Sequence, residues 1–324
     1  MKKYTLPLII LLFPLVIIAQ QKEHYSMYML NTPAFNPGVV GMSGTLEGTL
    51  VYRDQWAGLE GAPRQANFNM QMPFMLIGGG IGFDLNSDNR GATQDLSAGL
   101  SYSYLLRINQ ENRLGLGLRA GFYQRSLDGS KLRAPEGSYE LGINHNDPLL
   151  PEISVSGLSP LVDAGIYWIN SNFEFGVSAQ NLIPNGPQLD INGTTTLEYQ
   201  QEVNVTAFGQ TSFEIGSSIS VKPSVLVRTA FVETETHVSI SGYYEDFLML
   251  GVSYRGLEAN TQDAISILGG VQINDKLFLA YSYDLTLSDL ALVSNGSHEI
   301  LLSYNLGRPI GQGRPPKVIY NPRF

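Results

Sequence analysis

The chain has 324 residues, a formal net charge of −9 and no cysteine. The acidic balance argues against nucleic acid as a partner, and the lack of Cys excludes a disulfide framework and a thiolate metal site. Only 15% of the residues are charged, against about 25% in soluble domains. Gly (34 residues) and Tyr (17 residues) are frequent. In an exported chain, this composition favours an outer-membrane β-barrel.

Residues 1–19 have the composition of an export signal. Two lysines precede an apolar run that ends at the small residue Ala19, which predicts a secretory signal peptide cleaved before Gln20. A single transmembrane anchor is the weaker interpretation. The apolar run is shorter than the ~20 residues that a membrane helix needs, and it contains Pro7 and Pro14.

Residues 20–44 contain many residues that interrupt regular structure. We predict that they form a periplasmic N-terminal segment leading into the first strand. The proline-rich residues 307–324 cannot continue a strand and are predicted to form a periplasmic C-terminal tail. The transmembrane β-barrel is therefore expected between these segments, at residues 45–306.

Between these segments, apolar residues recur at alternate positions, which is the period of a β-strand. In 94–107, for example, Leu96, Leu100 and Tyr104 alternate with Ser97 and Ser101. The pattern predicts an all-β fold with about fourteen antiparallel strands, at 45–55, 65–73, 76–85, 94–107, 112–125, 161–169, 173–181, 201–214, 218–231, 235–245, 247–256, 263–273, 277–286 and 297–306. Pro223 lies inside one of them and predicts a bulge or a local break in the ladder.

The links between these strands alternate between short and longer ones. This is the layout of outer-membrane barrels, with short periplasmic turns and longer extracellular loops. An even strand count places both chain ends on the short-turn side. The two longest loops, 126–160 and 182–200, are rich in Pro, Gly, Asn and Asp and have no helical periodicity.

Each strand has one face of large apolar residues and one of small or polar residues. A soluble β-sandwich would bury the apolar face, whereas a membrane barrel turns it towards lipid. The polar faces are rich in Gly and Ser and poor in Lys, which favours the barrel. Tyrosine and tryptophan near strand ends match interfacial girdles, at Tyr52, Trp56, Tyr102, Tyr104, Tyr167, Trp168, Tyr243, Tyr244, Tyr281 and Tyr283.

The inward faces carry charges of both signs. They are Glu47, Arg53, Asp84, Arg119, Asp163, Glu174, Lys222, Arg228, Arg255 and Asp284. The main interpretation is that they form internal ion pairs and hydrogen-bonded groups that fill the barrel. The alternative is a charge-lined pore.

No pattern of catalytic or cofactor-binding residues stands out. His298 and Glu299 are adjacent, but a histidine that caps the last strand explains them better than a catalytic pair. The GLGLRA stretch at Gly115 matches a dinucleotide pattern without the helix that such a site requires. Residues 84–89, DLNSDN, lack the Glu of a calcium loop and predict an Asx-rich turn. We therefore expect a non-enzymatic protein without a cofactor or metal.

Two stretches carry a family resemblance, NPGVVG from Asn36 and YRDQWAGLEGAP from Tyr52. Together with GSHE from Gly296 and YSYDLTLSDL from Tyr281, the chain resembles the PorP/SprF family of type IX secretion system membrane proteins from the Bacteroidetes. Gly38 and Val39 depart from the family pattern. The matching residues expected to have a structural or partner-binding role are Asn36, Pro37, Gly41, Tyr52, Arg53, Gln55, Trp56, Gly61, Ala62, Pro63, Asp284, Ser288, Gly296, Ser297, His298 and Glu299.

The resemblance implies an outer-membrane barrel that works with type IX secretion components in the periplasm. It also implies a secreted partner, such as a surface adhesin recognised through its C-terminal sorting domain in gliding relatives. No catalytic residue is carried over from the family. The alternatives left open are a general porin or solute transporter, an outer-membrane hydrolase and a soluble adhesin.

Overall fold

The computed structural model describes residues 24–309, except 75–77, 110, 194, 232 and 257–263. The expected signal peptide and most of the expected C-terminal tail lie outside the described residues. No helix in the described part of the chain is long and apolar enough to cross a membrane.

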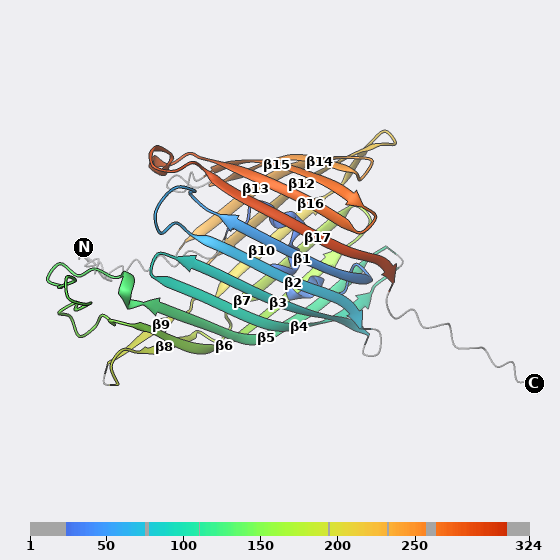
Figure 1. Ribbon diagram of the computed structural model, residues 1–324. Helices are drawn as coiled ribbons and strands as arrows, with labels where there is room; N and C mark the ends of the chain where they lie inside the picture. Colours follow the sequence, from blue (N-terminus) through green and yellow to red (C-terminus); the bar gives the residue numbers. More distant parts are fainter. Residues whose placement is uncertain are drawn as a thin grey trace, which may run out of the picture.

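Fourteen antiparallel strands of the described chain form a closed barrel (Figure 1). Each strand pairs with its neighbours in the chain, and the barrel closes where the first strand meets the last. The strands are β1 (Thr45–Asp54), β2 (Arg64–Phe74), β3 (Gly79–Arg90), β4 (Thr93–Arg107), β5 (Arg113–Asp128), β6 (Ser154–Ile169), β7 (Phe173–Gln180), β10 (Asn204–Thr211), β12 (Ile219–Thr229), β13 (Thr234–Tyr244), β14 (Leu248–Arg255), β15 (Ala264–Asn274), β16 (Leu277–Thr286) and β17 (Ser297–Pro309).

The large apolar side chains face outwards, as the alternation predicts. Leu100, Leu118 and Leu250 are 62–69% exposed, whereas Leu301 on the inner face is fully buried. Leu302 next to it faces outwards. Such a belt of exposed leucine suits the hydrocarbon of a membrane and would be unfavourable in water. The fourteen-strand barrel is therefore confirmed, with its apolar face outwards.

Four details differ from the sequence predictions. Residues 84–89 are not a turn but the middle of β3, where Asp84, Asn86 and Asp88 point into the lumen. The strand β6 begins at Ser154, seven residues earlier than expected. The loop after β7 contains a hairpin of β8 (Asn185–Asp190) and β9 (Thr196–Gln200). Tyr167 and Tyr243 face inwards and do not belong to a girdle.

The predicted break at Pro223 is present, on one side of its strand only. Pro223 pairs with Ile240 of β13 without a change of register. On the other side, β10 ends at Thr211 and the short strand β11 (Phe213–Ile215) continues the pairing with β12. The ladder is therefore interrupted opposite the residue that has no backbone N–H.

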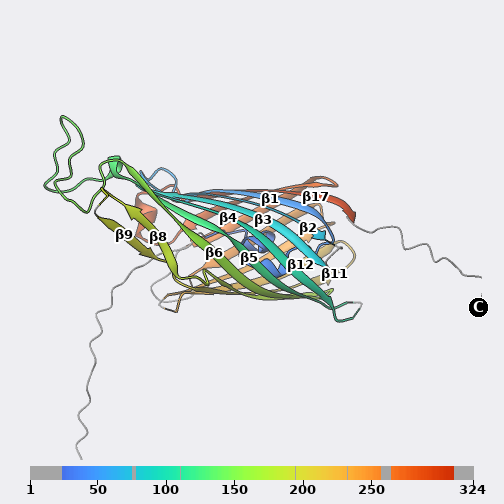
Figure 2. The same cartoon turned by 90° about the horizontal axis from the view of Figure 1, so that it is seen from below.

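The largest correction concerns residues 24–44, which we call the plug. The sequence predicts a periplasmic segment, but the plug lies inside the barrel, where Figures 1 and 2 show it as a blue coil. It contains three short 3-10 helices, η1 (Tyr28–Leu30), η2 (Thr32–Ala34) and η3 (Pro37–Val39). Prolines and asparagines do prevent regular structure there, but the segment also carries apolar side chains that need burial. Its apolar side chains pack against inward residues of the wall such as Phe208, Leu226, Met249, Leu268 and Leu301.

The plug runs along the lumen from one end of the barrel to the other. Ser26 contacts the start of β17 and the end of β16, which is the long-loop end. Gly41 lies against Gly80 near the start of β3, which is the short-turn end. The chain therefore descends through the whole barrel before it enters β1.

Candidate functional site: the plug, its anchors and the pocket above it

A buried ion-pair cluster lies at the long-loop end of the lumen, and Arg53 of β1 is its centre. One guanidinium nitrogen of Arg53 lies 2.6 Å from Asp284 Oδ2 on β16, and the other lies 3.0 Å from Glu299 Oε2 on β17. All three side chains are at most 1% exposed. One cation thus links three adjacent strands across the seam at which the barrel closes.

The same cluster holds the beginning of the plug. The backbone N–H groups of Ser26 and Met27 donate to the two carboxylate oxygens of Glu299, at 2.8 and 3.0 Å. The hydroxyl of Ser26 lies 2.8 Å from Asp284 Oδ2 and accepts a hydrogen bond from Arg53 at 3.0 Å. The motif residues Arg53, Asp284 and Glu299 therefore all bind Ser26 of the plug. Their positions in the sequence do not indicate this shared partner.

The NPG stretch of the plug lies against a row of glycines in the wall. The side chain of Asn36 accepts from Gly38 N at 2.8 Å, which caps η3, and donates to the carbonyl of Ile166. A Cβ atom at Gly117 of β5 would lie 2.2 Å from the carbonyl carbon of Pro37. The backbone of the plug approaches this wall so closely that only glycine fits, since neither main chain can give way.

Similar close approaches occur at Gly115 and Gly165, and at Gly80 where it meets Gly41. Gly41 itself has a φ of +81°, and its N–H donates to Gln71 Oε1 at 2.9 Å. These glycines on the inner face of the wall thus form the docking surface for the plug. The motif residues Asn36, Pro37 and Gly41 lie against this surface.

Most of the remaining motif residues join two loops at the long-loop end. The N–H of Trp56, which has a φ of +52°, donates to Ser297 Oγ at 3.0 Å. The N–H of Ala57 donates to the carbonyl of Gly296 at 2.8 Å. These two loops contain Gln55, Trp56, Gly61, Ala62, Pro63, Ser288 and Gly296. They form a fixed rim beside the Arg53 cluster.

Two motif residues face away from the lumen. Tyr52 is exposed on the outer face of β1. His298, the second residue of β17, lies beside two tyrosines, with its Nδ1 2.6 Å from the hydroxyl of Tyr281 and its ring centre 5.2 Å from that of Tyr283. The structure does not bring His298 into contact with the buried Glu299 cluster. A catalytic pair of His298 and Glu299 is therefore ruled out by their opposite directions.

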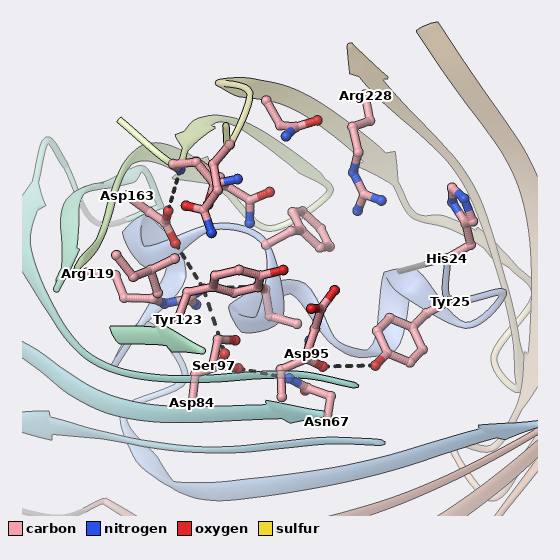
Figure 3. Close-up of a pocket in the computed structure, with 18 of the residues that line it drawn as sticks. His24, Tyr25, Asn67, Asp84, Asp95, Ser97, Arg119, Tyr123, Asp163 and Arg228 are labelled. Atoms are coloured by element: carbon pink, nitrogen blue, oxygen red, sulfur yellow. Dashed lines mark hydrogen bonds and ion pairs between the residues drawn. The ribbon is translucent and has the colours of Figure 1, made fainter. Parts of the chain in front are cut away.

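A polar pocket of about 120 Å³ lies above the plug in the lumen (Figure 3). Plug residues such as Tyr25 line it, together with wall residues from β2 to β7 and from β10, β12 and β13. Arg125 and Asp95 make a bidentate ion pair with both contacts at 2.7 Å. Arg119 lies 3.4 Å from Asp163 and also donates to carbonyls at the end of η2.

The inward charges therefore act as internal ion pairs and as contacts to the plug, as the main interpretation predicts. Glu47 accepts from the side chains of Gln71 and Asn305. The ammonium of Lys222 lies 4.6 Å from the ring centre of Tyr243. The plug lies between these charges in the lumen and packs against the apolar residues of the wall.

The family assignment rests on the whole barrel rather than on one site. The family model described as type IX secretion system membrane protein PorP/SprF matches residues 17–304. The chain belongs to this family. This member of the PorP/SprF family is a closed barrel in which the motif residues Arg53, Asp284 and Glu299 hold the N-terminal segment inside. No curated protein matches the chain.

Solved structures of outer-membrane transporters resemble this PorP/SprF barrel. The toluene transporter TbuX of Ralstonia pickettii is 10% identical over 87% of this chain and 93% of its own, with a TM-score of 0.50. A FadL homologue of Pseudomonas aeruginosa is 13% identical over 85% and 93%, with a TM-score of 0.47. The toluene transporter TodX of P. putida is 9% identical over 86% and 94%, with a TM-score of 0.46. At such identities the likeness shows the fold alone.

Proposed function

We propose that the protein is a non-enzymatic component of the type IX secretion and gliding machinery that works by binding. Its long-loop end would hold a secreted partner, with the C-terminal sorting domain of a surface adhesin as the specific candidate. Its short-turn end would contact periplasmic components of the machinery. Membership of the family supports a role in type IX secretion. The plug in the lumen is the observation that supports binding of a protein partner over conduction of small solutes.

The plug favours binding because its removal would break many contacts at once. It is held by the buried Arg53 cluster at one end and by the glycine row at the other. A channel for small solutes needs a continuous polar path, whereas here apolar side chains of the plug and wall pack together across the lumen. A barrel filled in this way offers its ends, rather than its interior, to other molecules.

The long-loop end supports this proposal with a rigid platform. The β8–β9 hairpin packs on β6, where Gly157 allows close contact with the backbone of Gln188 and Leu189 is fully buried. Arg125 lies 4.8 Å from the ring centre of Tyr199. From this base the loop of residues 129–153 extends beyond the barrel (Figure 2). Leu141 in this loop is fully exposed and offers an apolar side chain to a partner.

The test is to replace residues 133–150 by a short Gly-Ser linker in the producing strain. We expect the barrel to assemble with normal heat-modifiable migration, while export of one or a few large substrates is lost and small-solute permeability is unchanged. The control variant Leu292→Ser, Val293→Ser changes exposed side chains of another loop at the same end without touching the motif residue Ser288, and should keep export normal. Normal export by the first variant would contradict the proposal.

The alternative of a porin or solute transporter has a direct test. The purified protein is placed in a planar bilayer, and its conductance is recorded. We expect closed behaviour, because the lumen is filled. A stable open channel of solute size would favour the transporter instead.

A further inference from the structure

A second cluster joins the plug to the wall on the side of the lumen formed by β13. Its members are His24 at the start of the plug and Glu235 and His237 of β13. Glu235 and His237 are two residues apart in one strand, so both side chains point to the same face, here the lumen. The ligand atoms of all three side chains lie within 4.8 Å of one another.

We propose that these three residues form a divalent-cation site, of the type that zinc occupies, which clamps the plug to the barrel wall. Two imidazoles and one carboxylate are a donor set that zinc prefers. Both imidazoles approach the same oxygen. Oε1 of Glu235 lies 2.7 Å from His24 Nδ1 and 2.5 Å from His237 Nε2.

The size of the cluster fits one ion. Zinc lies about 2.0–2.2 Å from nitrogen and oxygen ligands, which places the ligand atoms of a tetrahedral site about 3.3 Å apart. The contacts of Glu235 therefore need to open by less than about 1 Å. His24 and His237 also line the pocket above the plug, so a fourth ligand from solvent can reach the ion.

The Nδ1 atom of His24 is buried beside the carboxylate of Glu235. It lies 2.7 Å from Glu235 Oε1, a contact that falls outside the geometry of a regular hydrogen bond. An ion between the two atoms would satisfy both.

Two arginines lie near the site. Arg228 lies 3.9 Å from Oε2 of Glu235, whereas both imidazoles approach Oε1. Arg255 lies 3.9 Å from Asp284 in the other cluster, and its charge also acts on His24 and His237. The carboxylate can thus give Oε1 to a cation while Oε2 keeps its contact with Arg228. The site stands independently of the proposed secretion function.

The test uses the full mature chain, purified in detergent without a histidine tag. Zinc is titrated by calorimetry, and Co²⁺ is used as a spectroscopic probe, since tetrahedral Co²⁺ gives intense visible absorption. We expect one ion per chain. The variants His24→Gln and Glu235→Gln should each weaken binding at least tenfold and remove the Co²⁺ spectrum.

Two comparisons keep the result clear. His24→Gln changes the plug alone, so barrel assembly, read by heat-modifiable migration, should be unaffected. His298→Ala removes a histidine on the outer face and should leave binding unchanged. Absence of stoichiometric binding, or binding that persists equally in His24→Gln and Glu235→Gln, would overturn the proposal.

Discussion

The contribution of the Arg53 cluster can be measured by removing its cation. In Arg53→Met, Asp284 and Glu299 remain buried without their shared partner. Breaking a buried ion pair by removing one member costs about 3–5 kcal/mol, because an uncompensated charge stays in a poorly solvated place. We expect the free energy of unfolding to fall by about that amount. The measurement is guanidinium unfolding of the protein refolded in lipid vesicles.

The chain offers a matched control in Arg64→Met. Arg64 also pairs with an aspartate, Asp54 at 3.5 Å, but its side chain is 67% exposed. An exposed pair contributes only about 0–1 kcal/mol. Adding Glu299→Gln to Arg53→Met should recover part of the loss, because it removes the carboxylate that Arg53 alone neutralises, whereas Asp284 keeps Arg255 at 3.9 Å. The reasoning would be refuted if Arg53→Met lost no more stability than Arg64→Met, or if the second change added a further loss.

Three more predictions concern the glycine row and the outer face. Gly117→Ala should displace the plug and expose it to added protease, whereas Gly209→Ala, with room for a Cβ, should not. Equal protection of both would contradict the close approach described above. Leu302→Arg should block membrane assembly, at a cost of about 2–4 kcal/mol near the midplane, which heat-modifiable migration detects. His298→Ala should leave assembly intact, so that an export assay reports on function alone, and failure to assemble would point to a structural role.

The strands could be predicted because their pattern is local. Alternation of Leu96, Leu100 and Tyr104 with small residues is visible in a short window, and it gives the correct face towards lipid. The prediction that Tyr167 belongs to a girdle rested on its place near a strand end and overlooked the alternation, which puts Tyr167 on the same inner face as Asp163. Its ring faces the lumen, where Gly176 opposite leaves the space that it occupies. A tyrosine near a strand end has two possible faces, and composition alone does not choose between them.

The plug could not be predicted from local pattern. Asn36 and Pro37 correctly indicate irregular backbone, but irregular backbone is compatible with either a solvated segment or one packed in a cavity. The sequence feature that indicates a plug is in the wall, where inward positions carry the apolar residues Phe208 and Leu226 instead of polar ones. Large apolar side chains that point into a barrel need something apolar to cover them. The motif match located Arg53 and Glu299 without showing that their common partner is Ser26.

The position of the plug also sets the order in which the molecule can be completed. Ser26 is among the first residues of the described chain, and the Glu299 carboxylate that accepts from its backbone N–H is 273 residues later. Glu299 is at the same time the cross-strand partner of Arg53 in the pairing of β1 with β17, which closes the barrel. The pairing of β1 with β17 and the binding of the plug therefore both depend on the last strand, so neither can be completed before that strand is in place. If the N-terminal segment lay outside the barrel when the seam closed, the Glu299 carboxylate would lose the backbone N–H groups of Ser26 and Met27. Closure of the barrel is therefore favoured when the plug is already inside.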